Sequence, residues 1–270
     1  MGRKLLENNT LSLIRPRKED SSKGDFGTLL TLCGSENMTG AAYLSVTAAL
    51  RSGVGLVRFC GDEKTVDKMQ RMLYEPTFLH LDEIEGTKYN AFLCGCGIGR
   101  AYDDRLKGIL ENCKADCVLD ADCINFLAVH IDVLKNIKCR AILTPHPGEM
   151  ARLCNTTVEA IQADREKIAS EFARDNNCIL VLKGKNTVVA DTDGSIFVNQ
   201  SGSSALAKGG SGDVLAGVIA SLVAQGYPPI DAARLGVYVH GLAGDNLALL
   251  YGKSGVIPSD LPKEIGRLLG

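Results

Sequence analysis

The chain has 270 residues, a formal net charge of −2 and a hydrophobic content of 45%. This content supports one large core, and the length suits a single α/β domain over residues 1–270. The nearly balanced charge argues against a nucleic-acid surface. No apolar run is long enough to cross a bilayer, and the N-terminus has no apolar signal core, so we expect a cytoplasmic protein without a membrane partner.

The 10 cysteines include no Cys-x-x-Cys pair. Five of them lie in or beside apolar, strand-like runs: Cys33, Cys60, Cys94, Cys117 and Cys178. Small apolar side chains of this kind are typical of a core, so we expect reduced thiols rather than disulfides or a metal site.

In chain order, residues 1–24 form a polar arm without periodicity, which we expect to pack on the domain edge. Beyond it, short apolar runs typical of strands alternate with segments whose apolar residues recur at helical spacing. The predicted strands are 28–33, 55–60, 89–94, 116–119, 140–143 and 178–182. The predicted helices between them are 40–51, 62–73, 102–112, 124–136 and 158–176.

This alternation predicts a mostly parallel central sheet with helices on both faces. After residue 182 the pattern changes, because the runs 187–190 and 195–198 flank Asp191-Thr-Asp-Gly194, which is typical of a hairpin. Three helices then close the chain, at 213–225, 229–251 and 259–268. Pro228-Pro229 separates the first two of them.

Several polar or glycine-rich motifs directly follow predicted strands. The carboxyl ends of parallel strands share one edge of a sheet, where ligands bind, so these motifs are expected to meet in one crevice. They are Gly95-Cys-Gly-Ile-Gly99, Asp120-Ala-Asp122, His146-Pro-Gly-Glu149 and Lys183-Gly184.

The most informative turn is Gly209-Gly-Ser-Gly212, which precedes an apolar helix with Asp213 in its first turn. Free backbone amides and the helix dipole predict an anion site there. Asp213 itself has two interpretations. It is either an ordinary N-terminal cap or a base that takes a proton from a hydroxyl attacking a phosphate.

Other candidates also have a structural and a functional interpretation. We favour helix capping for Asp122, whereas the role of Asp120 stays open; the two could hold Mg²⁺ through water. His146, fixed between two prolines, either has a structural role or donates a hydrogen bond to a ligand. The loop Lys183-Gly-Lys-Asn-Thr187 is a surface hairpin or a contact for an adenosine phosphate.

Taken together, these motifs resemble the ribokinase-like family and, within it, the NAD(P)H-hydrate dehydratases. The most specific are Thr144-Pro-His-Pro-Gly-Glu149 and Gly209-Gly-Ser-Gly-Asp-Val-Leu215. The resemblance implies a three-layer sandwich with a mostly parallel sheet. The resemblance to the family also covers Lys23-Gly-Asp-Phe-Gly27, Gly40-Ala-Ala42, Arg51-Ser-Gly-Val-Gly-Leu56, Leu119-Asp-Ala-Asp122, Asn199 and Gly202.

The resemblance implies dehydration of the S epimer of hydrated NADH or NADPH, with ADP or ATP converted to AMP or ADP and phosphate. Asp213 would deprotonate the ring hydroxyl, which attacks the terminal phosphate, while the amides of residues 209–212 stabilise the transferring group. The substrate would contact Ala41, Gly97, His146 and Asp213. The nucleotide would contact Lys183, Gly184, Lys185, Asn186, Thr187, Gly209, Gly210, Ser211 and Gly212.

Phosphate chemistry implies Mg²⁺, although no residue is assigned as its ligand. Relatives assemble as tetramers, so the resemblance implies a homotetramer. Many relatives carry an N-terminal epimerase domain; 270 residues leave no room for one, so a separate protein would perform any epimerisation.

Two positions depart from the family pattern. Cys96 stands where proline is usual, which predicts a softer loop, and Lys208 replaces a small residue, which adds a charge near the phosphates. Two other functions remain open: a thiazole or pyridoxal kinase of the same fold, and a nucleotide sensor without catalysis. Thr144-Pro-His-Pro-Gly-Glu149 favours the dehydratase over the kinases, and Asp213 argues against the sensor.

Overall fold

A computed structural model of the chain describes residues 2–100 and 102–270. The strands are β1 Arg3–Leu6, β2 Thr28–Leu32, β3 Leu56–Gly61, β4 Thr77–His80, β5 Ala91–Cys94, β6 Cys117–Leu119, β7 Ala141–Leu143, β8 Ile179–Leu182, β9 Val188–Ala190 and β10 Ile196–Asn199. The helices are α1 Thr39–Arg51, α2 Glu63–Gln70, α3 Asp103–Glu111, α4 Ala121–Val129, α5 Ile131–Asn136, α6 Pro147–Leu153, α7 Val158–Ala163, α8 Arg165–Asp175, α9 Ser211–Ala224, α10 Pro229–Gly255 and α11 Leu261–Leu269.

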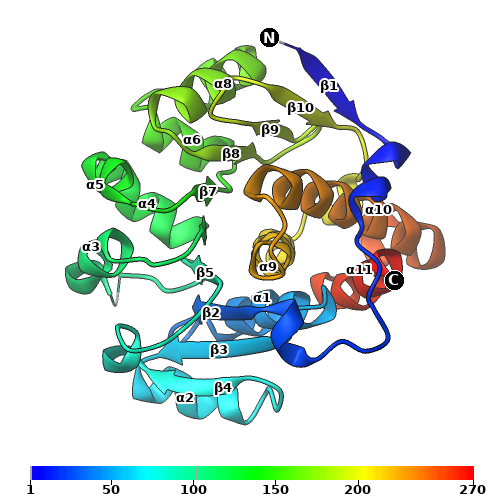
Figure 1. The fold of residues 1–270 in the computed structure, drawn as a ribbon. Helices are drawn as coiled ribbons and strands as arrows, with labels where there is room; N and C mark the ends of the chain where they lie inside the picture. The colour runs from blue at the N-terminus through cyan, green and yellow to red at the C-terminus, as the bar shows by residue number, and fades with distance from the viewer. Residues whose placement is uncertain (1, 101) are drawn as a thin grey trace.

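All of these strands belong to one sheet, in the order β1-β10-β9-β8-β7-β6-β5-β2-β3-β4 (Figure 1). Neighbouring strands run parallel except that β9 is antiparallel to both β8 and β10. The pair of β9 and β10 is the predicted hairpin. The mostly parallel sheet expected from the alternation of strands and helices is therefore confirmed.

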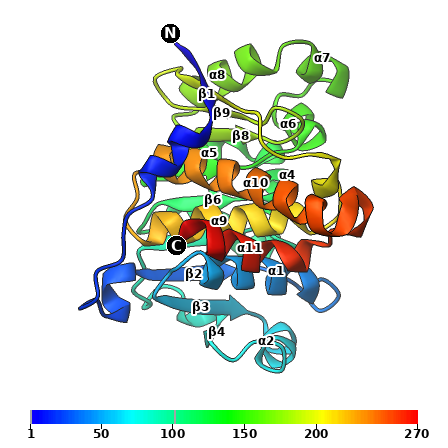
Figure 2. The same cartoon turned by 90° about the vertical axis from the view of Figure 1, so that its right-hand side faces the viewer.

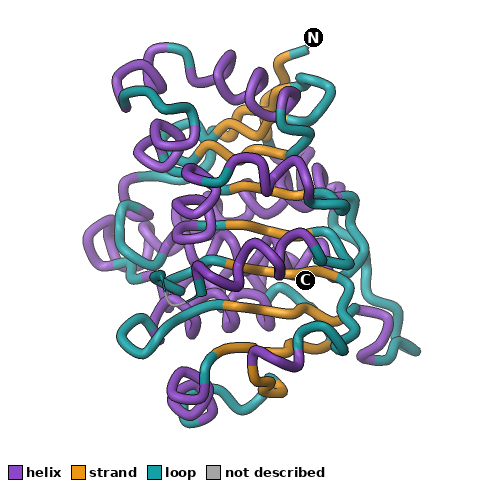
Figure 3. Tube along the Cα trace, turned by 90° about the vertical axis from the view of Figure 1, so that its left-hand side faces the viewer, coloured by secondary structure: helices purple, strands orange, loops and turns teal. Residues whose placement is uncertain are grey.

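Helices cover both faces of the sheet. The helices α1, α9, α10 and α11 lie on one face (Figures 1 and 2), and α3 to α6 with α8 lie on the other, in front of the strands in Figure 3. Side chains alternate along each strand, so Leu29 of β2 joins the core under the first layer and Leu30 joins the core under the second. This is the three-layer architecture expected from the sequence.

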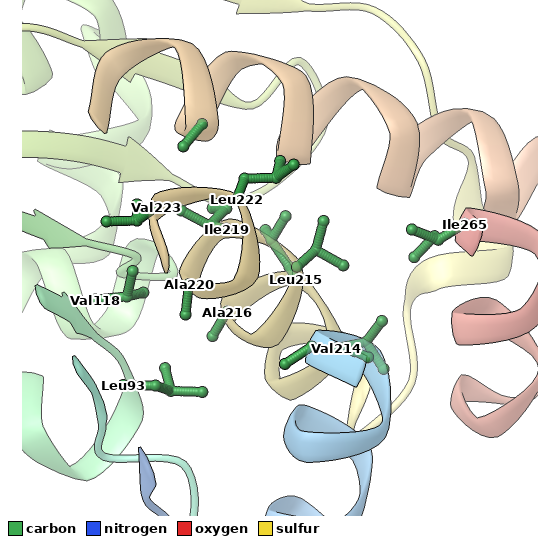
Figure 4. Packing of buried hydrophobic residues seen from close by; sticks show 14 of the residues in the cluster. Leu93, Val118, Val214, Leu215, Ala216, Ile219, Ala220, Leu222, Val223 and Ile265 are labelled. Carbon is green, nitrogen blue, oxygen red and sulfur yellow. The ribbon is translucent and has the colours of Figure 1, made fainter. Parts of the chain in front are cut away.

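Helix α9 is enclosed by the rest of the molecule, and every residue from 214 to 224 is buried. Figure 4 shows Ala216 and Ala220 directed at Leu93 and Val118 of the sheet. An apolar helix without a polar face is stable only in such a setting, since it has no surface suited to water. The N-terminus of α9 is thereby held rigidly against the strand ends.

Three short elements were not expected from the sequence. Residues 3–6 of the N-terminal arm form β1, which pairs in parallel with β10 and completes one edge of the sheet. Strand β4 completes the opposite edge, and α6 follows the Thr144-Pro-His-Pro-Gly-Glu149 motif. The arm does lie at the domain edge, as expected, but its first residues are strand.

Two predicted helices are interrupted. The segment 124–136 is divided into α4 and α5 at His130, whose φ and ψ are −130° and 54°. The segment 158–176 is divided at Asp164, with φ −148° and ψ 63°, because the Asp164 side chain accepts a hydrogen bond from the Lys167 amide and starts α8.

All ten cysteines are free thiols in the structure. Eight are buried, whereas Cys139 and Cys154 are partly exposed. Within residues 2–100 and 102–270, none of the helices combines the length and hydropathy needed to cross a bilayer.

Candidate active site

The motifs that follow β5, β6 and β8 converge with the N-terminus of α9. The Cys96 thiol lies 3.8 Å from Oδ2 of Asp120, and Nζ of Lys183 lies 2.7 Å from Oδ1 of the same carboxylate. A Cβ placed on Gly212 would come within 3.3 Å of that Nζ atom. Segments from residue 96 to residue 213 thus meet at the carboxyl edge of the sheet, as the strand-end rule predicts.

Helix α9 begins without a capping side chain. Its N-cap is Gly210, with φ 100° and ψ −19°, a conformation that favours glycine. The amides of the first turn have no acceptors within the helix and point out of its end. Such an N-terminus binds anions, and a side chain that would compete for these amides is absent from Gly210.

Asp213 therefore does not occupy the N-cap position. It lies three residues after Gly210, and its carboxylate, the Cys96 thiol and the Asp120 carboxylate each offer a ligand atom within 4.8 Å of the others. Burial, followed by the negative charge of Asp120, raises the pKa of Asp213 to about 6. A carboxylate with this pKa can accept a proton efficiently near neutral pH.

A buried ion pair lies beneath this turn. The carboxylate of Asp120, only 2% exposed, accepts hydrogen bonds from Nζ of Lys183 and, at 2.7 Å, from the Thr144 hydroxyl. Burial opposes the charge on Lys183, but Asp120 and Glu149 outweigh it and raise the pKa of the ammonium. Lys183 is therefore held as an ammonium close to Gly212 at the helix N-terminus, in a pair that is neutral overall.

The favoured role for Asp122 is wrong. Asp120, not Asp122, has the N-cap position of α4, although its carboxylate makes no capping bond. Oδ2 of Asp122 instead accepts a 2.8 Å hydrogen bond from the Gly99 amide. Asp122 thus fixes the glycine loop after β5 to the start of α4.

His146 caps α6. Its Nδ1 accepts hydrogen bonds from the amides of Gly148 and Glu149 at 3.0 and 3.2 Å, and its own amide donates to the Glu149 carboxylate at 2.7 Å. Burial and the charge of Lys183 lower the pKa of His146, so the ring is neutral at pH 7 with Nδ1 as the acceptor. Half of the side chain remains exposed at the site.

The loop 183–187 is ordered by contacts on both sides. Arg165 donates to the carbonyls of Leu182 and Lys183 at 2.9 and 3.3 Å, and the Thr187 hydroxyl donates to Gly184 at 2.9 Å. The loop is thus a rigid connection between β8 and β9. Its middle three residues, Gly184, Lys185 and Asn186, are exposed.

Gly97 and Ala41 lie against each other. Gly97 has φ +67°, and a Cβ there would come within 2.8 Å of Cβ of Ala41 and 3.0 Å of Cβ of Met38. The Ser35 hydroxyl donates to the Gly97 carbonyl at 3.0 Å, and the Gly34 amide donates to the backbone carbonyl of Cys96 at 2.7 Å. The two loops therefore pack directly on each other, with Cys96 and Gly97 buried and Ala41 partly exposed.

Sequence reasoning missed His240, which lies in the middle of α10. Its Nε2 is 3.2 Å from the hydroxyl and 3.0 Å from the carbonyl of Ser211, the first residue of α9. Burial lowers the pKa of His240 to about 4, so the ring is neutral. No motif surrounds His240, and its role becomes visible only when α10 packs on α9.

Lys208 is directed toward the end of α10. Its Nζ donates to the carbonyl of Ser254 at 2.7 Å and to that of Val256. The extra ammonium group expected at this position is thus held by carbonyl oxygens of a neighbouring segment.

The convergence of these motifs matches a known family. The family model described as NAD(P)H-hydrate dehydratase matches residues 29–267, which is most of the chain. The chain belongs to the NAD(P)H-hydrate dehydratase family. Among its relatives is the ADP-dependent (S)-NAD(P)H-hydrate dehydratase of Neisseria meningitidis, 40% identical over 240 residues, covering 86% of this chain and 81% of the relative.

Solved structures of dehydratases show the same fold. The ADP/ATP-dependent NAD(P)H-hydrate dehydratase of Bacillus subtilis, co-crystallised with ATP and Mg²⁺, matches with a TM-score of 0.86 at 29% identity, over 96% of this chain and 94% of that one. A ribokinase-like superfamily protein of Enterococcus faecalis matches with a TM-score of 0.85 at 26% identity, over 99% and 95%. The ribokinase-like fold expected from the sequence is confirmed.

The family also contains longer proteins. The bifunctional NAD(P)H-hydrate repair enzyme of Moorella thermoacetica is 39% identical over 269 residues, covering 91% of this chain. This chain spans about half the length of that relative, as the matched region is 50% of it.

Proposed function

We propose that the protein dehydrates the S epimer of hydrated NADH or NADPH to NADH or NADPH, with ADP or ATP as co-substrate. The observation that carries the proposal is the position of Asp213. It is a partly buried carboxylate with a pKa raised to about 6, in the first turn of an uncapped helix N-terminus. A proton acceptor beside a turn suited to an anion, within a chain of the dehydratase family, supports this reaction.

The chemistry has two steps. Asp213 takes the proton from the ring hydroxyl, whose oxygen attacks the terminal phosphorus, and the bond from that phosphorus to the rest of the nucleotide breaks. Phosphate is a far better leaving group than hydroxide. The ring nitrogen lone pair then expels it, and loss of a proton from the adjacent ring carbon restores the double bond.

We assign the transferring phosphoryl group to the turn formed by Gly209, Gly210, Ser211 and Gly212. Its backbone amides would stabilise the charge that develops there, and the ammonium of Lys183 lies immediately below Gly212. His240 acts as a positioning residue, because it holds both polar oxygens of Ser211.

The exposed residues Gly184, Lys185 and Asn186, with Thr187, are assigned to the rest of the nucleotide. This loop is rigid, open to solvent and continuous with Lys183, so its backbone is available to a ligand on the same edge. We assign the hydrated nicotinamide to the packed loops that carry Ala41 and Gly97 and to the exposed part of His146, which follows a strand of the same sheet edge.

Mg²⁺ fits this site. Both short hydrogen bonds to Asp120 go to Oδ1, and its Oδ2 receives only the 3.8 Å contact from Cys96, so one carboxylate oxygen retains capacity for an ion or its water. Mg²⁺ in proteins is held by one or two carboxylates together with substrate phosphates. Asp120 and Asp122 would hold it, and it would neutralise charge on the nucleotide.

The proposal is tested by a coupled assay. Purified protein is incubated with hydrated NADH and either ADP or ATP, and the near-ultraviolet absorbance of NADH and the release of phosphate are followed together. We expect both signals to rise in equal amounts. Stable transfer of phosphate to an alcohol would instead identify a kinase, and nucleotide binding without turnover would identify a sensor.

Asp213→Asn is the critical variant. Removing the base is expected to lower kcat roughly a hundredfold or more while nucleotide affinity is retained. The matched control is Asp132→Asn, an exposed acid in the first turn of α5 outside the site, which should keep full activity. Undiminished turnover by Asp213→Asn would remove this residue from the mechanism.

We also propose that the protein works as a homotetramer in the cytoplasm. The free state of all ten cysteines supports a reducing compartment. The exposed apolar side chains Leu249, Leu250 and Tyr251 near the end of α10 offer a surface suited to subunit contacts.

A further inference from the structure

A second group of reactive side chains lies at the opposite edge of the sheet from the candidate active site. The Sγ atoms of Cys113, Cys117 and Cys139 all lie within 4.8 Å of one another. Cys117 is the first residue of β6, and Cys139 lies two residues before β7 begins. The active-site motifs follow the carboxyl ends of these same strands, so the three cysteines form a separate site.

The backbone holds the three thiols in place. The Cys117 amide donates to the Arg140 carbonyl at 2.9 Å, and the Arg140 amide donates to the Asp116 side chain at 2.8 Å, which joins the loop before β7 to the start of β6. The Cys113 amide donates to Leu110 at 3.2 Å, at the end of α3. The site is therefore organised before any ligand arrives.

The spacing suits a shared metal ion. With metal–sulfur bonds of about 2.3 Å, thiolates around one ion lie roughly 3.8–4.0 Å apart, whereas a disulfide requires about 2.0 Å. The three thiols are free, and their separations, all below 4.8 Å, need only small side-chain adjustments to surround an ion. Cys113 and Cys117 are buried and Cys139 is partly exposed, so an ion has a route from solvent.

Hydrogen bonds hold the Cys113 sulfur in place. Its thiol donates to the Ala115 carbonyl at 3.1 Å. The Tyr89 hydroxyl also donates to its sulfur, at 3.8 Å. These two contacts fix the Cys113 sulfur beside those of Cys117 and Cys139.

We propose that Cys113, Cys117 and Cys139 bind one soft cation, Zn²⁺, as three thiolate ligands, with water completing the coordination. The ion would join the end of α3 to the starts of β6 and β7. Sulfur ligands alone select against Mg²⁺ and Ca²⁺, which prefer oxygen. The site is therefore chemically distinct from the one proposed for the nucleotide and its Mg²⁺.

The test uses the full-length protein, reduced and freed of metal under anaerobic conditions. It is titrated with Co²⁺, which substitutes for Zn²⁺ and gives a thiolate-to-cobalt charge-transfer band, and then with Zn²⁺ in competition with a chromogenic chelator. We expect one equivalent per chain, and a thermal unfolding midpoint that rises with Zn²⁺.

Two variants make the test specific. Cys139→Ser removes a ligand at a partly exposed position and should weaken Zn²⁺ binding at least ~100-fold. Cys154→Ser is the matched control, because Cys154 is also partly exposed but lies outside the cluster, and it should bind as the wild type does. Circular dichroism confirms that both variants are folded.

Three results would overturn the proposal. The first is the absence of a charge-transfer band in the reduced wild type. The second is an equal band in the Cys139→Ser variant. The third is a disulfide among the three cysteines, found by mass spectrometry of protein isolated with its thiols blocked at lysis.

Discussion

The carboxylate of Asp213 lies where its ionisation is opposed by burial and by Asp120, which together raise its pKa to about 6. The Lys183 ammonium and the Cys96 thiol act in the opposite direction but do not cancel this effect. A base must be deprotonated to act, so kcat/KM is expected to decrease as the pH falls below an apparent pKa of about 6. The pH–rate profile, measured with saturating nucleotide and with a check that the protein stays folded at each pH, tests this. A flat profile from pH 5 to 8, a range of about three units around this pKa, would contradict it.

The same shift affects the stability of the ligand-free protein. The folded-state pKa of Asp213, about 6, exceeds the ordinary 3.8. The contribution of Asp213 to the free energy of unfolding is therefore greatest at acid pH and is lost as the pH rises through about 6. Asp213→Asn should therefore be more stable than the wild type at pH 8, by at most about 3 kcal/mol, with little difference near pH 4. Urea unfolding at the two pH values measures this difference.

The buried pair of Asp120 and Lys183 gives a second prediction at this scale. Lys183→Met leaves the carboxylates of Asp120 and Glu149 without their cation, and removing one partner of a buried pair costs about 3–5 kcal/mol. Lys185→Met, on the exposed part of the same loop, should change the free energy of unfolding by under about 0.5 kcal/mol. Equal effects of the two changes in urea unfolding would show that the pair is not energetically important.

At the level of residues, the sequence indicated which side chains carry chemistry better than it indicated their partners. Asp120 and Lys183 both follow strands, but they are 63 positions apart, so nothing local predicted their ion pair. Asp122 was assigned to capping because its position suits a cap, yet its carboxylate accepts a hydrogen bond from the Gly99 amide instead. The substrate and nucleotide assignments themselves stay predictions.

At the scale of elements, the contact between α1 and α9 depends on one missing side chain. A Cβ on Gly217 would come within 2.1 Å of the Ser45 carbonyl oxygen, so the two backbones are in direct contact. We expect Gly217→Ala to destabilise the protein by roughly 3 kcal/mol or more, since an added methyl must force α1 away from α9.

The matched control for this change is Gly108→Ala in α3. Gly108 is also inside a helix but is exposed, with no atom within 4 Å of the added Cβ. Alanine has the higher helix propensity, so this change should stabilise the protein by about 0.5–1 kcal/mol. Opposite shifts of the thermal midpoint are the expected outcome, and two shifts of the same sign would argue against the backbone contact.

Long elements with a clear apolar period were predicted well, and α1, α9 and α10 lie close to their expected positions. The missed elements are short. Strands β1 and β4 have four residues each and exist because a neighbouring strand pairs with them, which is a tertiary effect. Helix α6 was not predicted, because the prolines of the motif at its N-terminus also suit a rigid loop.

For the whole molecule, a simple rule carried the largest part of the prediction. In a parallel sheet every strand ends at the same edge, so motifs spread from residue 95 to residue 213 could be expected to meet. The rule gives the meeting place but no distances. The contact of His240 with Ser211 and the grouping of three thiols at the other edge depend on packing that only the fold shows.

Helix α9 is part of the buried core, and the turn at its N-terminus is part of the candidate active site. Residues 214–224 are buried in the core, and the residues just before them form the turn that we propose to bind phosphate. Changes within α9 made to improve heat tolerance are therefore expected to move Asp213, the residue proposed as the base. Directed evolution toward a more durable enzyme should accordingly leave α9 intact and alter exposed positions on the second helical layer, such as Gly108 in α3.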